Sequence, residues 1–507
     1  MEVFSNLALG LSVALTPINL WYLLVGATAG VLIGAFPGLG PAAGIAILLP
    51  LTYAMDPVSA IIMLAAIYYG AMYGATVTAI LINTPGAPSA AACTFDGYPL
   101  AQKGRAGPAL VMEAVAAFVG GTTGVILVTL LAPLFSRVAR SFGPPEFFLI
   151  VLMGLVAVTL ILGKNRMYGV ISALIGFALA TVGMDVGSGQ LRFTFGSAQL
   201  FGGITFIPVV IGLFGVGELL HSIFRGDHVK TLSAKGLLER GAFWPSAREW
   251  AESKFSLVRG TLIGFVIGVI PGAGATLASF MAYGAEKAVS RTPERFGHGT
   301  MPGLAAPQAA DNAAVSGAMI PLLSLGIPGS ASTAVLLSAF VMWGLRPGPL
   351  LLTERPDFAW GLIASMYRGN LMLVVLMIVA IPVFLAIIKV PFRILAPVVV
   401  VLCTVGAYSV NGSMVETWLM LGAGVLGFFM KRLGFSPAAL IVALVLGPLA
   451  ENTLQQSLII SDGSLLIFVT RPISLVITVL IVFIFLSARV AQRVRPRAPL
   501  GAGSPAT

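Results

Sequence analysis

Two short segments of proline and glycine lie in apolar sequence and carry residue types that can bind a solute inside a membrane. They are Pro37-Gly38-Leu39-Gly40 and Pro271-Gly272-Ala273-Gly274. Proline and glycine interrupt helices, and an interrupted helix in a bilayer is tolerated where its free backbone groups line a cavity or contact a solute. We therefore predict a substrate cavity lined by Pro37, Gly38, Gly40, Pro271, Gly272 and Gly274. Close helix packing is the alternative, but it explains only the glycines that precede each segment.

A second pair of segments, 83–89 and 326–333, adds hydroxyl groups to the same pattern. Proline favours the first turn of a helix, and glycine lets a ligand approach the backbone closely. A half-helix that begins there directs free N–H groups and the positive end of its dipole toward an anion. The predicted substrate contacts are Asn83, Thr84, Pro85, Gly86, Ser89, Pro328, Gly329, Ser330, Ser332 and Thr333. The alternative is a pair of kinked helices whose hydroxyl groups bond to their own backbone.

Polar side chains at membrane depth are costly, so they are candidates for function. Asp311 and Asn312 follow Gln308 into an apolar stretch, and Asn83 ends another. An intramembrane carboxyl or amide oxygen can hold a cation, and a carboxyl can hold a proton. We predict that Asn83, Asp311 and Asn312 bind the coupling ion, and that Asn312 also contacts the substrate.

Two further charged residues have structural interpretations. Arg368 interrupts a long apolar run, where an anchor at the membrane interface is favoured over a functional role. Asp96 belongs to Asp96-Gly97-Tyr98-Pro99, whose composition predicts a turn.

The composition requires a membrane protein. The 507-residue chain is 58% hydrophobic and only 9% charged, against about 25% charged residues in ordinary soluble domains. Sustained apolar stretches without alternation recur along almost the whole length, which argues against a β-barrel. At about 20 residues for each crossing, the predicted fold is an all-α polytopic membrane protein with about twelve transmembrane segments. These form two homologous halves that contain broken helices or re-entrant hairpins.

An internal duplication is predicted from matched motifs. Pro271-Gly272 follows Pro37-Gly38 by 234 residues (271 against 37), and Pro328-Gly329 follows Pro85-Gly86 by 243 (328 against 85). We predict a first transmembrane half at 1–217, a polar loop at 218–256, a second half at 257–488 and a basic tail at 489–507. The number of crossings in each half decides whether the halves are parallel or inverted, and both arrangements stay open.

The formal net charge of +10 comes from basic residues in short loops and in the C-terminal tail. The positive-inside rule explains this distribution without nucleic acid as a partner. We therefore place the polar loop 218–256 and the C-terminus in the cytoplasm.

Motifs of enzymes and of nucleotide-driven pumps are absent from the sequence. It contains no HExxH, GxSxG or GxxxxGK[ST], and its two cysteines form no CxxC with each other and no cluster with the three histidines. We predict that the protein is not an enzyme and holds neither cofactor nor metal. Without a nucleotide site, active transport would use an ion gradient, of H⁺ or Na⁺, or another subunit.

These motifs resemble the large membrane subunit of the tripartite tricarboxylate transporters, the TctA family. The resemblance is carried by Gly34-x-x-Pro37-Gly38-x-Gly40, by Tyr68-Tyr69-Gly70-Ala71-Met72-Tyr73-Gly74 and by the segment 320–330, and it extends over nearly the whole chain. Further matching motifs are Pro85-Gly86, Asp96-Gly97-Tyr98, Asn312-Ala313, Gly348-Pro349, Arg432-Leu433-Gly434-Phe435, Leu446-Gly447-Pro448 and Arg471-Pro472-Ile473.

The resemblance implies a subunit of the bacterial inner membrane that takes up organic carboxylates, tricarboxylates or dicarboxylates, by symport with protons or sodium ions. It also implies two partners: a small membrane subunit (TctB-like) and a periplasmic solute-binding protein (TctC-like) that delivers the substrate. The sequence departs from the family pattern at Ala87-Pro88, at Gln308, at Asp311 and at Arg368, where an acidic residue, glutamate, asparagine and an apolar residue are respectively expected. These departures concern the coupling ion and the charge of the substrate, not the fold.

The predicted function is therefore the large translocation subunit of such an uptake system. Within transport, the alternative is a single-component carrier or exporter of organic anions. A membrane-embedded enzyme or a channel is an alternative of another class. The missing catalytic cluster disfavours the enzyme, and paired helix interruptions fit a carrier better than a channel.

Overall fold

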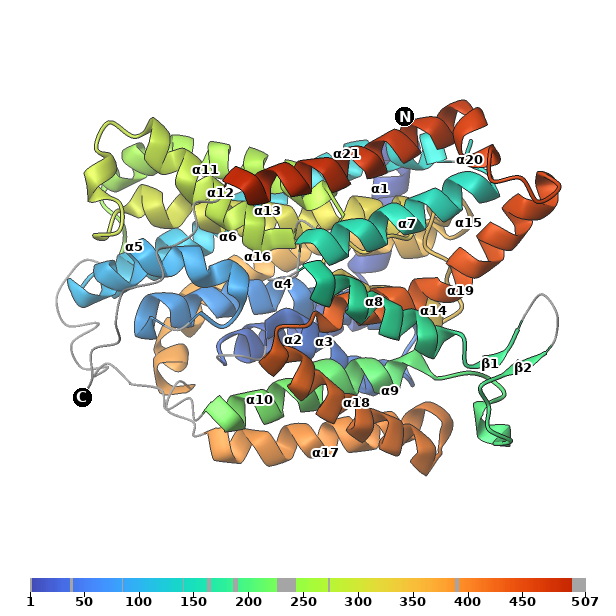
Figure 1. Ribbon diagram of the computed structural model, residues 1–507. Coiled ribbons are helices and arrows are strands. Elements are labelled where there is room, and N and C mark those ends of the chain that lie inside the picture. Colours follow the sequence, from blue (N-terminus) through green and yellow to red (C-terminus); the bar gives the residue numbers. More distant parts are fainter. Residues whose placement is uncertain are drawn as a thin grey trace.

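The protein is a bundle of helices, most of which run side by side across the molecule (Figure 1). The computed structural model describes residues 2–36, 40–83, 85–139, 141–161, 166–185, 190–225, 243–271, 274–387 and 392–494. Two short strands, β1 (Gly183–Met184) and β2 (Leu191–Arg192), pair as an antiparallel hairpin that projects from one end of the bundle. The prediction of an all-α polytopic membrane protein is confirmed.

The described helices are numbered in chain order. Those of the first part are α1 (Glu2–Ala14), α2 (Pro17–Gly34), α3 (Gly40–Leu48), α4 (Pro57–Ile82), α5 (Ala91–Gln102), α6 (Ala106–Ala139), α7 (Pro144–Ile161), α8 (Arg166–Ala180), α9 (Phe206–Val210) and α10 (Gly217–Arg225). Those of the second part are α11 (Ala247–Val269), α12 (Gly274–Val289), α13 (Met301–Leu325), α14 (Ala331–Met342), α15 (Leu351–Glu354), α16 (Pro356–Ile387), α17 (Phe392–Asn411), α18 (Met414–Leu433), α19 (Pro437–Ile460), α20 (Ile467–Thr470) and α21 (Pro472–Val494).

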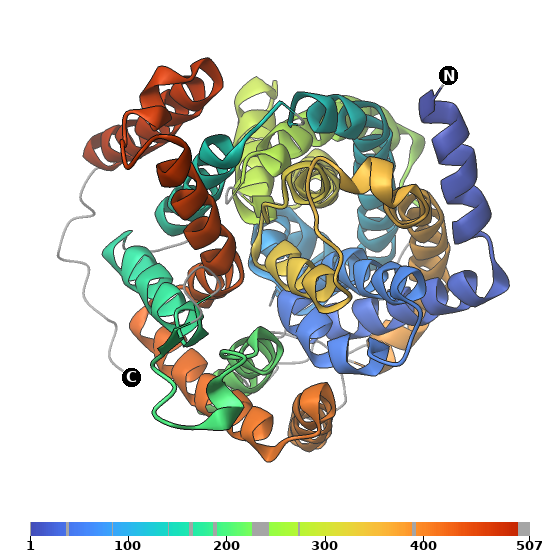
Figure 2. The same ribbon diagram turned by 90° about the vertical axis from the view of Figure 1, so that its right-hand side faces the viewer.

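Six of the described helices are long and apolar enough to cross a membrane: α2, α4, α6, α16, α18 and α19. The apolar core of α4 is completely buried by other helices. α13 is buried along almost its whole length but is more polar than these six, because it carries Gln308, Asp311 and Asn312. Figure 2 views the helices nearly end-on, with α1, α17, α18 and α21 at the periphery. The polar helix α13 is therefore shielded from lipid by protein.

Two helix pairs, α2 with α4 and α11 with α13, pack at backbone contact because glycines remove the side chains between them. A Cβ placed on Gly30 would lie 2.5 Å from the carbonyl oxygen of Ile67, and one on Gly268 would lie 2.6 Å from the Cα of Ala314. Real Cβ atoms do not approach so closely, so these positions require glycine. The glycines that precede each Pro-Gly segment therefore serve helix packing.

The contacts of these two pairs occur at matched positions. Glycines 26, 30 and 34 face residues 63, 67 and 71, and glycines 260, 264 and 268 face residues 306, 310 and 314. The glycines differ by 234 (260 against 26) and their partners by 243 (306 against 63), which are the two offsets found between the sequence motifs. One packing geometry thus occurs twice, while the division into two homologous halves stays a prediction.

The first pair of Pro-Gly segments interrupts the helices where the sequence predicts it. α2 ends at Gly34 and α3 begins at Gly40, whereas α11 ends at Val269 and α12 begins at Gly274. Gly40 and Gly274 have φ of 63° and 65°, a left-handed conformation that favours glycine. The predicted site residues Pro37, Gly38 and Gly272 lie outside the described residues, and Pro271 is partly buried beside the second interruption.

Candidate transport site

The second pair of interruptions begins at two left-handed helix ends. α4 ends at Asn83 with φ 55°, and α13 ends at Gly326 with φ 71°. A residue in this conformation closes a helix by letting its N–H bond back to the last turn. Asn83 is exposed, and no hydrogen bond joins it to Asp311 or Asn312 within the described ranges. The structure thus gives Asn83 the place of a helix cap.

Gly86 lies where the ends of α2, α3 and α4 meet. A Cβ on Gly86 would stand 2.8 Å from the Cα of Ala75 and would collide with the carbonyl oxygen of Gly34. Gly40 approaches from α3, since a Cβ placed there would lie 3.9 Å from the carbonyl oxygen of Gly86. Gly329 occupies the matching place against α13 and the end of α11. The structure therefore brings two predicted site residues, Gly40 and Gly86, together.

The start of α14 is fixed by a capping box. The Ser330 N–H donates to Thr333 Oγ1 at 2.7 Å, and the Thr333 N–H donates to Ser330 Oγ at 3.3 Å. The Tyr68 hydroxyl on α4 lies 3.1 Å from Ser330 Oγ, which joins α4 to this helix start. These hydroxyl groups serve the local backbone first, as the kinked-helix alternative proposes. Pro328 and Ser332 are buried in the same segment, whereas Thr84 lies outside the described residues.

The carboxyl group of Asp311 on α13 is buried, and among the described residues no ion pair or hydrogen bond balances its charge. Its side chain is 0% exposed, and neither carboxylate oxygen has a hydrogen-bond partner among the described residues. The hydroxyl of Ser89, in the short turn Pro88–Ala90 before α5, faces this carboxyl and also lacks a partner at hydrogen-bonding geometry. A buried carboxylate is unfavourable unless it takes up a proton or a cation. Asp311 is therefore the predicted residue best placed to bind an ion.

Asn312 leaves a free acceptor beside Asp311. Its Nδ2 donates to the backbone oxygen of Gln308 at 3.2 Å, and its Oδ1 has no partner within the part of the chain that the structure describes. Asn312 is only 2% exposed. Its amide oxygen thus stays available to a ligand, as predicted for an ion or substrate contact.

Sequence reasoning missed Glu113 on α6. The carboxyl of Glu113 is 0% exposed and accepts a hydrogen bond of 2.8 Å from Gln308 Nε2. One signal for it was present, because Glu113 is an acidic residue within a long apolar span, Ala106–Val138. The structure places it one hydrogen bond away from the helix that carries Asp311.

Arg368 on α16 is partly buried, and its Nε is buried without a hydrogen-bond partner among the described residues. Leu371, Val375 and Val379, which follow it at helical spacing, are 48%, 55% and 72% exposed. Arg368 thus lies at the border of an exposed helix face, and its role as an anchor at the membrane interface stays a prediction. A separate apolar pocket of about 380 Å³ between α8, α9 and α18 contains none of the predicted site residues.

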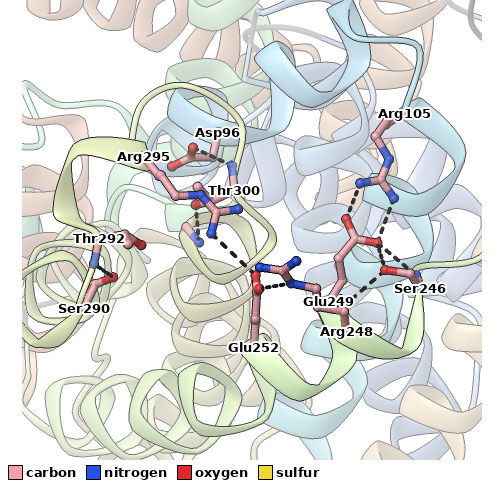
Figure 3. Close-up of polar contacts among 11 residues, drawn as sticks. Asp96, Arg105, Ser246, Arg248, Glu249, Glu252, Ser290, Thr292, Arg295 and Thr300 are labelled. Atoms are coloured by element: carbon pink, nitrogen blue, oxygen red, sulfur yellow. Dashed lines mark hydrogen bonds and ion pairs between the residues drawn. The ribbon is translucent and has the colours of Figure 1, made fainter.

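The turn predicted at Asp96 is wrong, because Asp96 lies inside α5 and is completely buried. Its carboxylate accepts a hydrogen bond from the backbone N–H group of Thr300 (Figure 3). It also accepts hydrogen bonds from the N–H groups of Gly297 and Gly299 and from the Tyr283 hydroxyl. The three N–H donors belong to the segment before α13, and Tyr283 belongs to α12, so all four donors are far away in sequence. Long-range hydrogen bonds, not the local turn composition, determine the conformation of this residue.

Asp96→Asn is expected to loosen the contact between α5 and α12. The oxygen of asparagine can keep the three N–H donors, but its amide nitrogen replaces Oδ2, so the Tyr283 hydroxyl loses its acceptor, at about 1–3 kcal/mol. Thermal unfolding of the purified protein in detergent measures this loss. Asp357→Asn, at an exposed ion pair with Arg355, is the matched control. Equal unfolding temperatures for Asp96→Asn and the wild type would contradict this role.

A second group of polar contacts joins the start of α6 to α11. Arg105 donates to both carboxylate oxygens of Glu249, and Arg295 lies 3.8 Å from Glu252 one turn further along α11 (Figure 3). Burial acts to raise the pKa of Glu249, but the hydrogen bonds from Arg105 and from Ser246 outweigh it and lower that pKa below its usual range. Glu249 therefore stays ionised, and the Arg105 pair persists, at neutral pH.

This pair predicts a pH dependence of stability. Because its pKa is lowered in the folded protein, Glu249 stabilises the fold above its ordinary pKa of about 4.3, and this contribution disappears as the pH falls through the lowered value. The unfolding temperature of the wild type is expected to exceed that of Glu249→Gln at pH 7. The difference should shrink steadily below pH 4, and a difference independent of pH would contradict the prediction.

Comparison with known proteins now identifies the kind of protein that carries this site. The sequence pattern described as "Tripartite tricarboxylate transporter TctA family" matches residues 20–442. The chain belongs to this family. The TctA family is a family of transporters, so the chain is a multi-pass membrane transport protein and not an enzyme.

Two relatives of this TctA-family chain come from Agrobacterium vitis. One, an uncharacterized 52.8 kDa protein in the TAR-I ttuC' 3' region, is 42% identical over 476 residues, or 94% of each chain. The other, an uncharacterized protein in the TAR-II ttuC' 3' region, is 42% identical over 211 residues, or 42% of this chain and 87% of the relative.

Proposed function

We propose that the chain is the large translocation subunit of a tripartite uptake system for organic carboxylates, either tricarboxylates or dicarboxylates, driven by an ion gradient. The observation that carries this proposal is Asp311, an uncompensated carboxyl at the centre of a membrane protein of the TctA family. It lies beside Ser89, which follows the interruption at Pro85-Gly86. A transporter needs such a group, because binding and release of an ion there can be linked to substrate movement.

The substrate would bind between the two matched sets of interruptions. The helix start at Ser330 and the turn that contains Ser89 can both direct backbone N–H groups toward a carboxylate. Backbone groups of the first pair of interruptions would also contact the substrate. These are the groups of Pro37, Gly38 and Gly40 and of Pro271, Gly272 and Gly274. Asp311 and Asn312 would bind the coupling ion, H⁺ or Na⁺. Asn83, which caps the end of α4, stays a predicted contact of the ion or the substrate.

The partners would be a small membrane subunit (TctB-like) and a periplasmic solute-binding protein (TctC-like). The family description supports a tripartite assembly in general. The chain would lie in the bacterial inner membrane, with the loop 218–256 and the basic tail in the cytoplasm, as the positive-inside rule predicts.

Affinity purification of the tagged chain from mildly solubilised native membranes tests this assembly. We expect a small polytopic protein in fixed stoichiometry, and a periplasmic binding protein after cross-linking. Isolation of the folded chain alone would contradict the tripartite assembly and favour a single-component carrier of organic anions. Product formation from a carboxylate in sealed vesicles would contradict transport itself.

A further inference from the structure

Glu113 belongs to a hydrogen-bonded cluster that none of the predicted site residues explains. Thr76 on α4 donates to Gln308 Oε1 at 2.8 Å, and the Cys93 thiol on α5 lies 3.6 Å from the same oxygen. Gln308 Nε2 on α13 donates to Glu113 Oε1 on α6 at 2.8 Å. We call Thr76, Cys93, Glu113, Gln308 and the neighbouring Asp311 the carboxyl cluster. Four helices meet in it.

The hydrogen bonds fix the orientation of the Gln308 amide. Its oxygen accepts from Thr76 and Cys93, so its nitrogen must face Glu113. Glu113 Oε1 is therefore an acceptor, and Glu113 Oε2 is left without a partner in the described chain. A carboxyl in this setting has one free oxygen, which can carry a proton.

Two other buried glutamates are paired with arginine, while a third, Glu416 at 6% exposure, accepts hydrogen bonds from Thr205 and Asn411. Glu146, also 0% exposed, receives Arg471 Nε at 2.8 Å, and Glu286, 4% exposed, receives Arg259 Nε at 2.8 Å. Glu113 has no such ion pair within the described ranges, and neither has Asp311. The difference indicates that the charge of the carboxyl cluster is balanced by something other than a side chain.

The ionisable groups that face Glu113 add no positive charge. They are Tyr73 from α4, Cys93 from α5, and Asp311 from α13, which is near enough to interact electrostatically. Each of these three groups is either neutral or negatively charged, and none can carry a positive charge. Two carboxyls in such surroundings cannot both be ionised without a large penalty.

The nearest described cations are engaged or distant. Arg105, eight residues before Glu113, is held by Glu249. α16 contacts α6 at Gly121, eight residues beyond Glu113 and roughly 12 Å along the helix. Arg368 on α16 is partly buried, but it is not among the groups that act electrostatically on Glu113 or Asp311. Neither guanidinium group compensates the carboxyl cluster.

We propose that Glu113 and Asp311 form a buried proton-binding pair, and that the proton is the coupling ion. The part of this inference that concerns coupling rests on the proposed transport function. Sodium is the competing ion, because a hard cation needs several oxygen ligands at once, and both Asp311 oxygens, Ser89 Oγ and Asn312 Oδ1 have no hydrogen-bond partner among the described residues. At Glu113 itself, one carboxyl oxygen and the neighbouring amide oxygen of Gln308 are already occupied by hydrogen-bond donors. The single free oxygen of Glu113 therefore suits a proton, and the sodium arm of the test below separates the two ions.

The step at this site is a proton transfer. When the carboxyl cluster becomes accessible to one side of the membrane, the O–H bond of the carboxyl breaks, the proton passes to water and a carboxylate remains. Protonation from the other side reverses the step. The neutral pair is the state suited to the closed, buried arrangement.

Infrared difference spectroscopy of the purified chain under pH steps tests proton binding without any substrate. A protonated carboxyl absorbs at a higher frequency than a carboxylate, so the wild type is expected to show a band that titrates with pH. Glu113→Gln, which preserves the acceptor for Gln308, should remove part of this band. Glu146→Gln is the matched control and should leave the band unchanged, because the ion pair with Arg471 keeps Glu146 ionised.

The outcomes separate this inference from the proposed function. A band unchanged in both Glu113→Gln and Asp311→Asn, or shifted by sodium instead of pH, would overturn the proton pair. If Glu113→Gln does not fold, Asp311→Asn alone still tests the band. A different result separates the two proposals: the band is lost in Glu113→Gln, but the wild-type chain transports no carboxylate substrate. That result supports the proton pair and refutes the transport function.

Discussion

Valine at Gly86 is expected to abolish uptake and to reduce the amount of folded protein in the membrane. A Cβ at this position meets backbone on two sides: the carbonyl oxygen of Gly34 and the Cα of Ala75, at 2.8 Å. Backbone atoms in packed helices cannot move aside as the end of a flexible side chain can. The Gly86 N–H also donates to the Ala75 carbonyl oxygen at 3.0 Å, so the segment cannot withdraw without losing a hydrogen bond.

Uptake assays and quantification of membrane-inserted protein measure this effect. Gly284→Val on α12 is the matched control, because nothing lies within 4 Å of a Cβ there, and it should behave as the wild type. Gly329→Val is expected to be less severe, since its nearest contact is the side chain of Ala318, at 3.0 Å. Normal insertion and wild-type uptake by Gly86→Val would show that this interruption is neither closely packed nor part of the transport path.

Asp311→Asn is expected to remove the dependence of uptake on the ion gradient. The substitution keeps the shape of the side chain but removes the group that can be charged, so no ion need be taken up for the site to close. Accumulation against a gradient should be lost, while passive exchange of substrate persists. Uptake measured with and without an imposed gradient separates these two activities.

Asp357→Asn serves as the control for this experiment. Asp357 is 44% exposed at the start of α16 and pairs with Arg355, so its loss should leave gradient dependence intact. Gradient dependence unchanged in Asp311→Asn would remove Asp311 from coupling, although its burial without a partner would still require an explanation.

The helix interruptions could be predicted from sequence because proline and glycine act locally. Gly40 and Gly274 adopt the left-handed conformation that glycine allows, and α3 and α12 begin at these two residues. Asp96 could not be placed in this way, because its partners are backbone N–H groups about 200 residues away (Gly297 to Thr300 against Asp96).

The candidate site was predictable only in part. Asp311 is conspicuous as a charge in apolar sequence, and the structure shows that it is uncompensated. The Ser330 and Thr333 hydroxyls looked like ligand donors, but they cap α14. Glu113 joins Gln308 across 195 residues (308 against 113). Local sequence does not show that four helices meet at one point.

Gradient-driven carboxylate uptake through this chain can be measured in proteoliposomes. These contain the chain with its co-purifying membrane subunit, with the binding protein and radiolabelled citrate outside and an inward ion gradient. We expect accumulation above the external concentration, and complete loss of that accumulation when an ionophore collapses the gradient. Citrate is one tricarboxylate, so a panel of dicarboxylates and tricarboxylates is assayed in parallel. If none of them accumulates, or if accumulation survives collapse of the gradient, this chain does not carry out gradient-driven carboxylate uptake.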